Sequence, residues 1–167
     1  TAEWMGMRCS WALWLVALLI LATGVVQAQG VAVTPAGELP IVEEPVTITI
    51  LMLQTVGVED YNNGNKFTEW VEEQTGINME FEIVPIGEGV TKLNLALASG
   101  ELPDVIAGLP FDAGLLAQQG AEGQLVPLNQ YIEDLGFWTK QAFYEERPYL
   151  LPLITSPDGN IYGLPDI

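Results

Sequence analysis

Polar side chains suited to holding a hydroxylated ligand gather in two short segments of the chain. Each segment follows an apolar run, and their members are Gln54, Thr55, Glu59, Asp60, Tyr61 and Asn62 in the first and Phe111 and Asp112 in the second. Amides and carboxylates hold hydroxyl groups through paired hydrogen bonds, and aromatic rings stack on the apolar face of a sugar. Any one of these residues is better explained by a solvated loop, but together they support a ligand site at least as well.

Reactive chemistry finds little support in the same sequence. The chain contains no histidine, which removes the commonest general base and the commonest transition-metal ligand. Two acidic pairs, at residues 72–73 and 145–146, hold helix neighbours that do not face each other, so we interpret them as solvated. Residues 158–160 (DGN) lack the further ligands of a calcium loop and are interpreted as a turn. We therefore expect no catalytic residue, no metal site and no cofactor.

The negative charge of the chain limits the kinds of partner that it can bind. The 167 residues include 22 acidic and 5 basic side chains, which give a formal charge of −17. Nucleic acids and anionic membrane surfaces would repel such a chain. Hydrophobic residues make up 49% of the sequence, enough for one domain with a sizeable core. We interpret the acidity as a source of solubility and expect no nucleic-acid partner.

Residues 1–28 have the pattern of a secretory signal peptide. A basic start at Met7 and Arg8 precedes a continuous apolar run at residues 11–21, and residues 26–28 (VQA) offer a cleavage site. A transmembrane anchor is the alternative, but the apolar run is short for a span of roughly 20 residues. Cys9, the only cysteine, precedes this run and does not fit a lipobox. We expect an exported protein, periplasmic or extracellular, that is not lipid-anchored through a lipobox cysteine.

The remaining patterns predict alternating strands and helices. Residues 29–45 are rich in proline and glutamate without periodicity, so we expect a disordered leader. Strands are expected at residues 46–53, 77–84 and 104–107, and helices at residues 66–75 and 89–100. The first strand is expected to be central, and the second, which has one wet face, to lie nearer a sheet edge. Phe67 and Trp70 lie at helical spacing and are expected in the core.

This order of elements predicts a mostly parallel sheet with helices packed on it. Ligands bind beyond the carboxyl ends of the strands in such a sheet, so both polar segments should open on the same edge. Asp104, at the start of the third strand, is interpreted as a turn residue that caps local backbone donors.

Shorter patterns follow the third strand. Helices are expected at residues 114–119, 129–135 and 139–147, and Asn129 is expected to cap the second of them. Residues 156–160 predict a turn, because proline presets φ and Asp-Gly tolerates positive φ. A returning strand is expected at residues 161–165.

Five features occur in an order that resembles extracellular solute-binding proteins of ABC transporters, family 1. They are the secretory signal, VTITILML at 46–53, ALASGELPDVI at 96–106, LVPLNQYIED at 125–134 and DGNIYGLP at 158–165. The resemblance implies an α/β, periplasmic-binding-protein-like lobe with a mostly parallel sheet flanked by helices. It covers residues 46–167 as the amino-terminal lobe of a two-lobed protein. The second lobe is missing, and both ends of the sequence resemble cuts in a gene fragment.

The resemblance also implies a role and a site. Proteins of this family close two lobes on a ligand like a hinge and deliver it to a membrane permease. The implied partners are a small solute, a sugar or an oligosaccharide, and an ABC transporter permease; we expect a monomer that needs no cofactor. The implied ligand-binding residues are Gln54, Asp60, Tyr61, Phe111, Asp112 and Tyr162. One lobe cannot close, so we expect these 167 residues alone to bind little.

Two other classes of function are open alternatives. A secreted carboxylate-dependent glycoside hydrolase would need an acid and a base across one cleft, and no acidic pair has a spacing that favours it. Turnover of a chromogenic glycoside would support that alternative. The other is a non-catalytic acidic surface domain, and a neighbouring permease gene would argue against both.

Overall fold

The computed structural model describes residues 31–57 and 60–165 of the chain. The predicted signal peptide, residues 1–28, lies outside the described residues, as do the closing residues 166–167. Within the described ranges, no helix is both long enough and apolar enough to cross a membrane.

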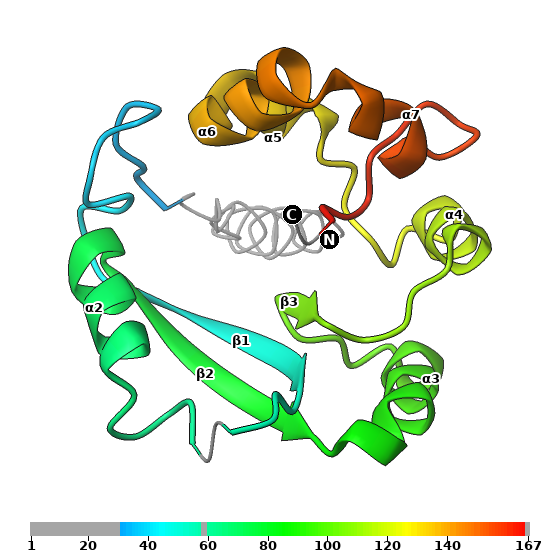
Figure 1. The fold of residues 1–167 in the computed structure, drawn as a ribbon, viewed down its shortest axis with the longest axis horizontal. Coiled ribbons are helices and arrows are strands. Elements are labelled where there is room, and N and C mark those ends of the chain that lie inside the picture. The colour runs from blue at the N-terminus through cyan, green and yellow to red at the C-terminus, as the bar shows by residue number, and fades with distance from the viewer. Residues whose placement is uncertain (1–30, 58–59, 166–167) are drawn as a thin grey trace, which may run out of the picture. The chain divides into compact units, whose positions relative to one another are not determined.

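A three-stranded parallel sheet organises the first half of the described chain (Figure 1). β1 (Val46–Leu53) lies in the centre, with β2 (Ile77–Val84) on one side and β3 (Val105–Ala107) on the other. β1 pairs with β2 along its whole length, from Val46 opposite Ile77 to Leu53 opposite Val84. The predicted central position of the first strand and edge position of the second are confirmed.

α2 (Lys66–Thr75) begins and ends at the residues that the sequence predicts. The Asn65 side chain accepts hydrogen bonds from the backbone N–H groups of Phe67 and Thr68, which satisfies donors that an uncapped helix leaves unpaired. Gly76 ends the helix with a φ of 76°, a conformation that glycine adopts without a Cβ clash.

The aromatic residues of α2 do not face the core. The prediction that Phe67 and Trp70 are core residues is wrong, because their side chains are 71% and 56% exposed. Thr68 is buried instead, and Glu72, one turn later, accepts a hydrogen bond from the Met79 N–H of β2 (2.7 Å). Helical spacing alone does not show which of two neighbouring faces turns inward, and here the face with the polar contact to β2 does.

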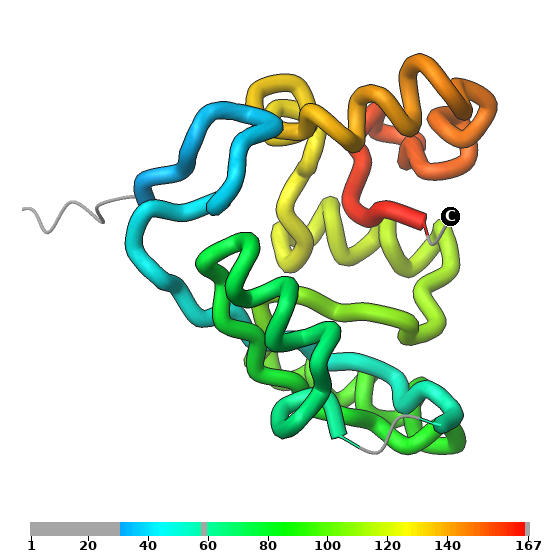
Figure 2. The backbone as a smooth tube through the Cα atoms, turned by 60° about the vertical axis from the view of Figure 1, so that its left-hand side comes forward, coloured from blue at the N-terminus to red at the C-terminus, as the bar shows by residue number. Residues whose placement is uncertain are grey.

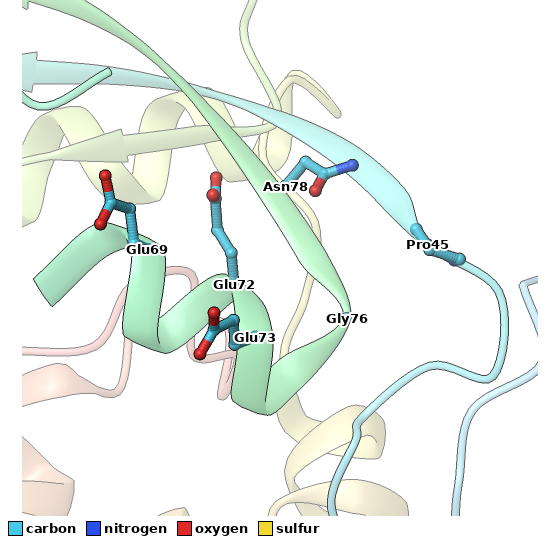
Figure 3. Close-up of a pocket in the computed structure, with 6 residues that line it drawn as sticks. All are labelled: Pro45, Glu69, Glu72, Glu73, Gly76 and Asn78. Carbon is cyan, nitrogen blue, oxygen red and sulfur yellow. The ribbon is translucent and has the colours of Figure 1, made fainter. Parts of the chain in front are cut away.

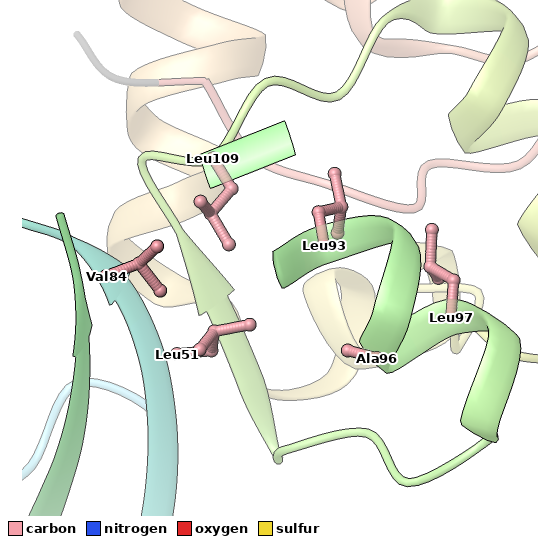
Figure 4. Close-up of a cluster of buried hydrophobic side chains, with 6 residues drawn as sticks. All are labelled: Leu51, Val84, Leu93, Ala96, Leu97 and Leu109. Carbon is pink, nitrogen blue, oxygen red and sulfur yellow. The ribbon is translucent and has the colours of Figure 1, made fainter. Parts of the chain in front are cut away.

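The main hydrophobic core lies between the sheet and α3 (Gly89–Ser99), which follows a short 3₁₀ turn (Ile86–Glu88). Figure 4 shows its buried side chains, which are Leu51, Val84, Leu93, Ala96, Leu97 and Leu109. Full burial of an aliphatic side chain of this kind contributes about 1.5–3 kcal/mol. Gly89 allows close packing here, because a Cβ on it would lie 3.1 Å from Leu53 Cδ1 and 3.2 Å from Leu109 Cδ2.

Residues 31–45, expected within a disordered leader, have a defined path in the structure. Val33 and Val42 form an antiparallel bridge, and the Val42 N–H donates to the Thr75 carbonyl oxygen at the end of α2 (3.3 Å). The Val42 side chain is buried and packs beside Gly76. Composition does not reveal this order, because it depends on one buried valine rather than on a periodic pattern.

The chain continues beyond β3 through a series of short helices, which Figure 2 follows from yellow-green to red. They are α4 (Ala113–Ala121), α5 (Asn129–Leu135), α6 (Phe137–Lys140), a π-helical segment (Gln141–Glu146), a 3₁₀ turn (Pro148–Leu150) and α7 (Leu151–Ile154). The helix predicted at residues 139–147 therefore begins earlier, at Phe137, and changes its hydrogen-bond pattern half-way. Phe143 is the buried residue of the π-helical segment.

The last described segment is a tight turn rather than the strand predicted at residues 161–165. Its ladder is a single antiparallel bridge between Thr155 and Ile161. The Asn129 amide donates to the Gly159 carbonyl oxygen (3.1 Å) and accepts from the Ile161 N–H (2.9 Å). The prediction that Asn129 caps its own helix is wrong, because its side chain bonds this turn instead.

Candidate functional site

The carboxyl ends of β1 and β3 lie side by side at one edge of the sheet. Residues 50–52 of β1 pair in parallel with residues 105–107 of β3, so the two strands run toward the same edge. Just past this ladder, a Cβ on Gly108 would lie 3.6 Å from the Leu53 Cβ. Gly108 has a φ of 67°, which directs the chain away from the sheet. Both polar segments therefore begin at the same edge, and that they open there as one ligand site stays a prediction.

Gln54 is the first residue past β1. Its backbone N–H donates to the Val84 carbonyl oxygen (2.8 Å), which continues the ladder with β2 by one residue. Its side chain is exposed, and no residue in the described ranges hydrogen-bonds its amide. An exposed amide at this position can both donate to and accept from a ligand hydroxyl.

Asp60 organises its own loop. Its Oδ1 accepts hydrogen bonds from the backbone N–H groups of Asn62 (2.8 Å) and Asn63 (3.2 Å), and its Oδ2 accepts from the Asn63 amide (2.9 Å). The Asn63 side chain and the Asn62 N–H together lower the pKa of the Asp60 carboxyl, because they stabilise its charged form. The Asp60 carboxylate therefore mainly stabilises this turn. Its oxygens can still accept a further hydrogen bond from a ligand.

Tyr61 and Asn62 hold this loop on the outer side of β2. The Tyr61 ring lies against Phe81, with ring centroids 5.4 Å apart. The Asn62 amide donates to the Phe81 carbonyl oxygen (3.0 Å) and accepts from the Phe81 N–H (2.8 Å). Since β1 lies between β2 and β3 and the loop lies beyond β2, this part of the loop lies about three strand spacings, or about 14 Å, from β3.

The segment after β3 contributes one apolar and one acidic residue. Phe111 is half-buried and packs against the core between the sheet and α3. The Asp112 Oδ1 accepts a hydrogen bond from the Leu115 N–H (2.8 Å), which makes Asp112 the N-cap of α4. An aspartate directly before an apolar helical run is a sequence signal for such a cap.

Tyr162 is buried against α4, near the carboxyl end of that helix. Its hydroxyl donates to Asp158 Oδ2 (2.7 Å), and this hydrogen bond raises the pKa of Tyr162 and lowers that of Asp158. Its ring lies so close to Gly120 that a Cβ there would come within 2.3 Å of ring carbons. Gly120 is eight residues after Asp112, or about 12 Å along the helix, so the structure does not bring Tyr162 to Asp112.

Asp104 joins two strands rather than capping local donors as the sequence suggests. Its Oδ2 accepts hydrogen bonds from both the backbone N–H and the hydroxyl of Thr49 (2.8 Å each), and the Thr49 hydroxyl accepts from the Asp104 N–H (3.1 Å). The Thr49 N–H, followed by its hydroxyl, lowers the pKa of Asp104. The short strand β3 is therefore attached to β1 by a side chain at its amino end.

An acidic pocket of about 360 Å³ lies at the opposite end of the strands, as Figure 3 shows. Its lining residues are Pro45, Glu69, Glu72, Glu73, Gly76 and Asn78. Pro45 precedes β1, and Gly76 precedes β2, so this pocket is separate from the edge where Gln54 and Gly108 lie. Within the described ranges, no group of three or more acidic or cysteine side chains is arranged to hold a metal ion.

Residues 60–165 match the profile of the family described as bacterial extracellular solute-binding protein. The chain belongs to this family. The match covers more than half of the 167 residues, including both segments after the strands except Gln54 and its neighbours. The family and the relatives that follow are binding proteins.

One relative in sequence is the fructooligosaccharide ABC transporter substrate-binding protein FusA of Streptococcus pneumoniae. It is 28% identical over 95 residues, which cover 57% of this chain and 17% of FusA. The solved complex of FusA with kestose has a TM-score of 0.62 at 23% identity, over 71% of this chain and 24% of that one. The chain therefore spans about a sixth to a quarter of the length of this relative.

Two further solved structures share the fold. An HMO-binding solute-binding protein of Bifidobacterium longum infantis has a TM-score of 0.60 at 21% identity, over 73% of this chain and 23% of that one. The alginate-binding protein AlgQ2 has a TM-score of 0.58 at 28% identity, over 75% of this chain and 26% of that one. The expected fold class, a partial periplasmic-binding-protein-like lobe with a parallel sheet flanked by helices, is confirmed.

Proposed function

We propose that this chain is one lobe of an exported protein that captures an oligosaccharide or sugar-like solute and delivers it to an ABC transporter permease. The family match over residues 60–165 carries the proposal. The proposed class of solute is supported by FusA, a fructooligosaccharide-binding relative solved with kestose, and by the HMO- and alginate-binding neighbours. The protein is proposed to act as a monomer, in the periplasm or outside the cell.

We propose that the ligand meets the lobe at the carboxyl edge of the sheet. Gln54, directly after β1, and Asp112, five residues after β3, are proposed to supply polar groups there, and Phe111 a ring. Asp60, Tyr61 and Tyr162 complete the proposed set, and their own contacts hold the loop beside β2 and the last turn rather than the edge at Gln54.

Binding without chemistry is the proposed mechanism. Hinge closure requires a ligand that binds the closed form more tightly than the open form, and this needs a second wall across the cleft. The chain spans a quarter of the solved relatives, so the second wall is proposed to come from the remaining length of the complete protein. No observation favours the glycoside hydrolase alternative.

The experiment is a calorimetric titration of kestose and of longer fructooligosaccharides into two samples. One is the protein expressed from its complete gene, and the other is the 167-residue chain. We expect clear binding by the first and little by the second. Submicromolar binding by the 167 residues alone would overturn the need for a second wall. Failure of the complete protein to bind any fructose-, milk- or alginate-type oligosaccharide would overturn the proposed function.

Two variants locate the site in the complete protein. Gln54→Ala and Asp112→Asn should each weaken solute binding by about 1–3 kcal/mol. The first removes an amide that can bond a ligand hydroxyl, and the second removes the negative charge of an acceptor. Asparagine is as good an N-cap as aspartate, so Asp112→Asn should keep α4 intact. Glu122→Gln, an exposed carboxylate at the other end of α4, is the control and should bind as the unchanged protein does.

A further inference from the structure

We propose that the outer edge of β2 is a latent self-association surface, which the side chains of Asn62, Glu72 and Thr75 keep closed against a second copy of this chain. We call these three residues the edge-closing residues. The surface lies along the side of β2 that faces away from β1, so the inference does not rest on the proposed solute site.

The direction of the β2 backbone groups follows from its bonds to the β1 segment. The carbonyl oxygens of Gly76 and Val84 accept hydrogen bonds from the N–H groups of Val46 and Gln54, respectively. In a parallel ladder, successive residues alternate in the side to which their N–H and C=O point. The groups of residues 78, 80 and 82 therefore face β1, and those of residues 77, 79, 81 and 83 face outward.

Two outward N–H groups bond side chains of α2. The Ile77 N–H donates to Thr75 Oγ1 (3.2 Å), and the Met79 N–H donates to Glu72 Oε1 (2.7 Å). Both acceptors belong to the last two turns of the helix that precedes β2. An incoming strand pairs through these same N–H groups, so it would have to displace both side chains.

Phe81, the third outward-facing residue, has both its N–H and its carbonyl group hydrogen-bonded by a side chain. Asn62 accepts from the Phe81 N–H (2.8 Å) and donates to the Phe81 carbonyl oxygen (3.0 Å), as a peptide group of a neighbouring strand would. Three consecutive outward N–H groups are thus bonded by side chains from two different segments. These side-chain hydrogen bonds occupy the N–H groups that a further strand would need, so they block pairing on this side of β2.

Charge adds a second barrier against a like strand. Glu80 and Glu82 are exposed on one face of β2, and Glu82 pairs with Lys92. In a two-fold antiparallel pair centred on residue 80, Glu80 would lie opposite its own copy, and Met79 would lie opposite Phe81. The apolar face would match itself, but two like charges directly opposite each other destabilise a pair. The second copy is therefore the occupant that fits the edge when its N–H groups are freed, and the charge at Glu80 weakens this pairing without preventing it.

The first test uses the unchanged chain and amide hydrogen exchange. The N–H groups of Met79 and Phe81 should exchange about tenfold or more slowly than those of an unstructured peptide, because side chains bond them. Exchange at the unstructured rate would overturn the proposal without any substitution.

The second test opens the edge. The variant Asn62→Ala/Glu72→Ala should form dimers at concentrations at which the unchanged chain is a monomer, as measured by light scattering after size exclusion. Added salt, or a further Glu80→Gln change, should strengthen this association, since both weaken like-charge repulsion. Asn63→Ala is the matched control, because Asn63 lies in the same loop but bonds Asp60 and not β2.

The outcomes separate edge closure from general loosening of the fold. A double variant that is folded by circular dichroism and stays monomeric would overturn the proposal, and so would equal association by the Asn63→Ala control. If the double variant does not fold, Glu72→Ala alone serves, because Asn62 and its loop remain. We then expect the Met79 N–H to exchange about three- to tenfold faster, and an unchanged rate would overturn the proposal.

Discussion

From β1 to β3 the chain is held by a parallel ladder and by a core of aliphatic side chains between the sheet and α3. From α4 to the last turn, buried side chains such as Ile132 and Phe143 lie among short helices. Individual contacts join these helices to one another and to the last turn: Asn129 bonds the turn after α7, and Tyr162 lies on Gly120. In the first region many weak contacts share the stabilisation, so the loss of one leaves the pattern recognisable. In the second, one residue can determine the path of a whole segment.

The largest effect is expected in the ladder region. Leu93→Ala should lower the free energy of unfolding by about 2–5 kcal/mol, because Leu93 is 1% exposed and its removal leaves a cavity in the core. Urea unfolding measures the change. The matched control is Leu95→Ala on the same helix, where the side chain is 63% exposed. Equal losses in the two variants would contradict the assignment of the core to one face of α3.

A contact of the second region comes next. Gly120→Ala should cost about 1–3 kcal/mol despite the better helix propensity of alanine, because its Cβ would overlap the Tyr162 ring. Urea unfolding, with fluorescence of the tyrosine and tryptophan residues, reports both stability and local packing. Gly114→Ala on the same helix is the control, since the one atom within 4 Å of its Cβ would be Asp112 Oδ1 at 3.2 Å, at the end of a side chain rather than in a buried ring. A Gly120→Ala variant that is more stable than the unchanged chain would contradict the close contact between Gly120 and the Tyr162 ring.

Asn129 tests whether one amide holds the last turn. Asn129→Ala should lower stability by about 1–2 kcal/mol, because two backbone groups of the turn lose their partner. Hydrogen exchange should show faster exchange at the Ile161 N–H and no change in β1. Gln130→Ala, one residue later, removes only an exposed bond to Asp134 and is the control. A turn that stays protected in the Asn129 variant would show that the bridge alone is sufficient.

Acid should act on both regions through aspartates whose folded-state pKa is lowered, including Asp104 in the first and Asp158 in the second. A carboxyl with a depressed folded-state pKa adds stability above its unfolded-state pKa, and this stability is lost as pH falls through the folded-state value. Asp104→Asn should therefore be less stable than the unchanged chain at neutral pH, and the gap should close in acid. Urea midpoints across this range measure it, and a gap independent of pH would contradict the assignment.

The smallest effect is expected at the exposed rings of α2. Trp70→Ala should change the free energy of unfolding by less than about 0.5 kcal/mol, because the side chain is 56% exposed. Thermal unfolding provides the measurement. A loss comparable to that of Leu93→Ala would show that the ladder region has a second core on the side of α2.

The sequence predicts the ladder region well, because periodicity carries its information. Residues 46–53 and 77–84 read as strands and residues 66–75 as a helix, and each range matches the structure. Periodicity does not predict which helix face turns inward, and so Phe67 and Trp70 are misplaced. Beyond β3 the prediction fails where single side chains decide, as with Asn129 at the last turn.

The sequence likewise predicts one part of the candidate site and not the other. The common edge of the two polar segments follows from strand direction, which the sequence predicts correctly. The N-cap role of Asp112 has a signal in the sequence, an aspartate directly before an apolar helical run. The local roles of Asp60 and Tyr162 do not follow from residue type, because each depends on partners that only the folded chain supplies. Whether these side chains bind a solute stays a prediction.

β1 comes first along the chain, yet both of its neighbours in the sheet come later. During synthesis, residues 46–53 have two unpaired edges until β2 has been made, and one until β3 follows. Thr49 meets Asp104 only after 55 further residues. Because distant pairings form more slowly than local helices, we expect α2 and α3 to assemble first. Until β2 and β3 have been made, the apolar residues of β1 would remain without their strand partners.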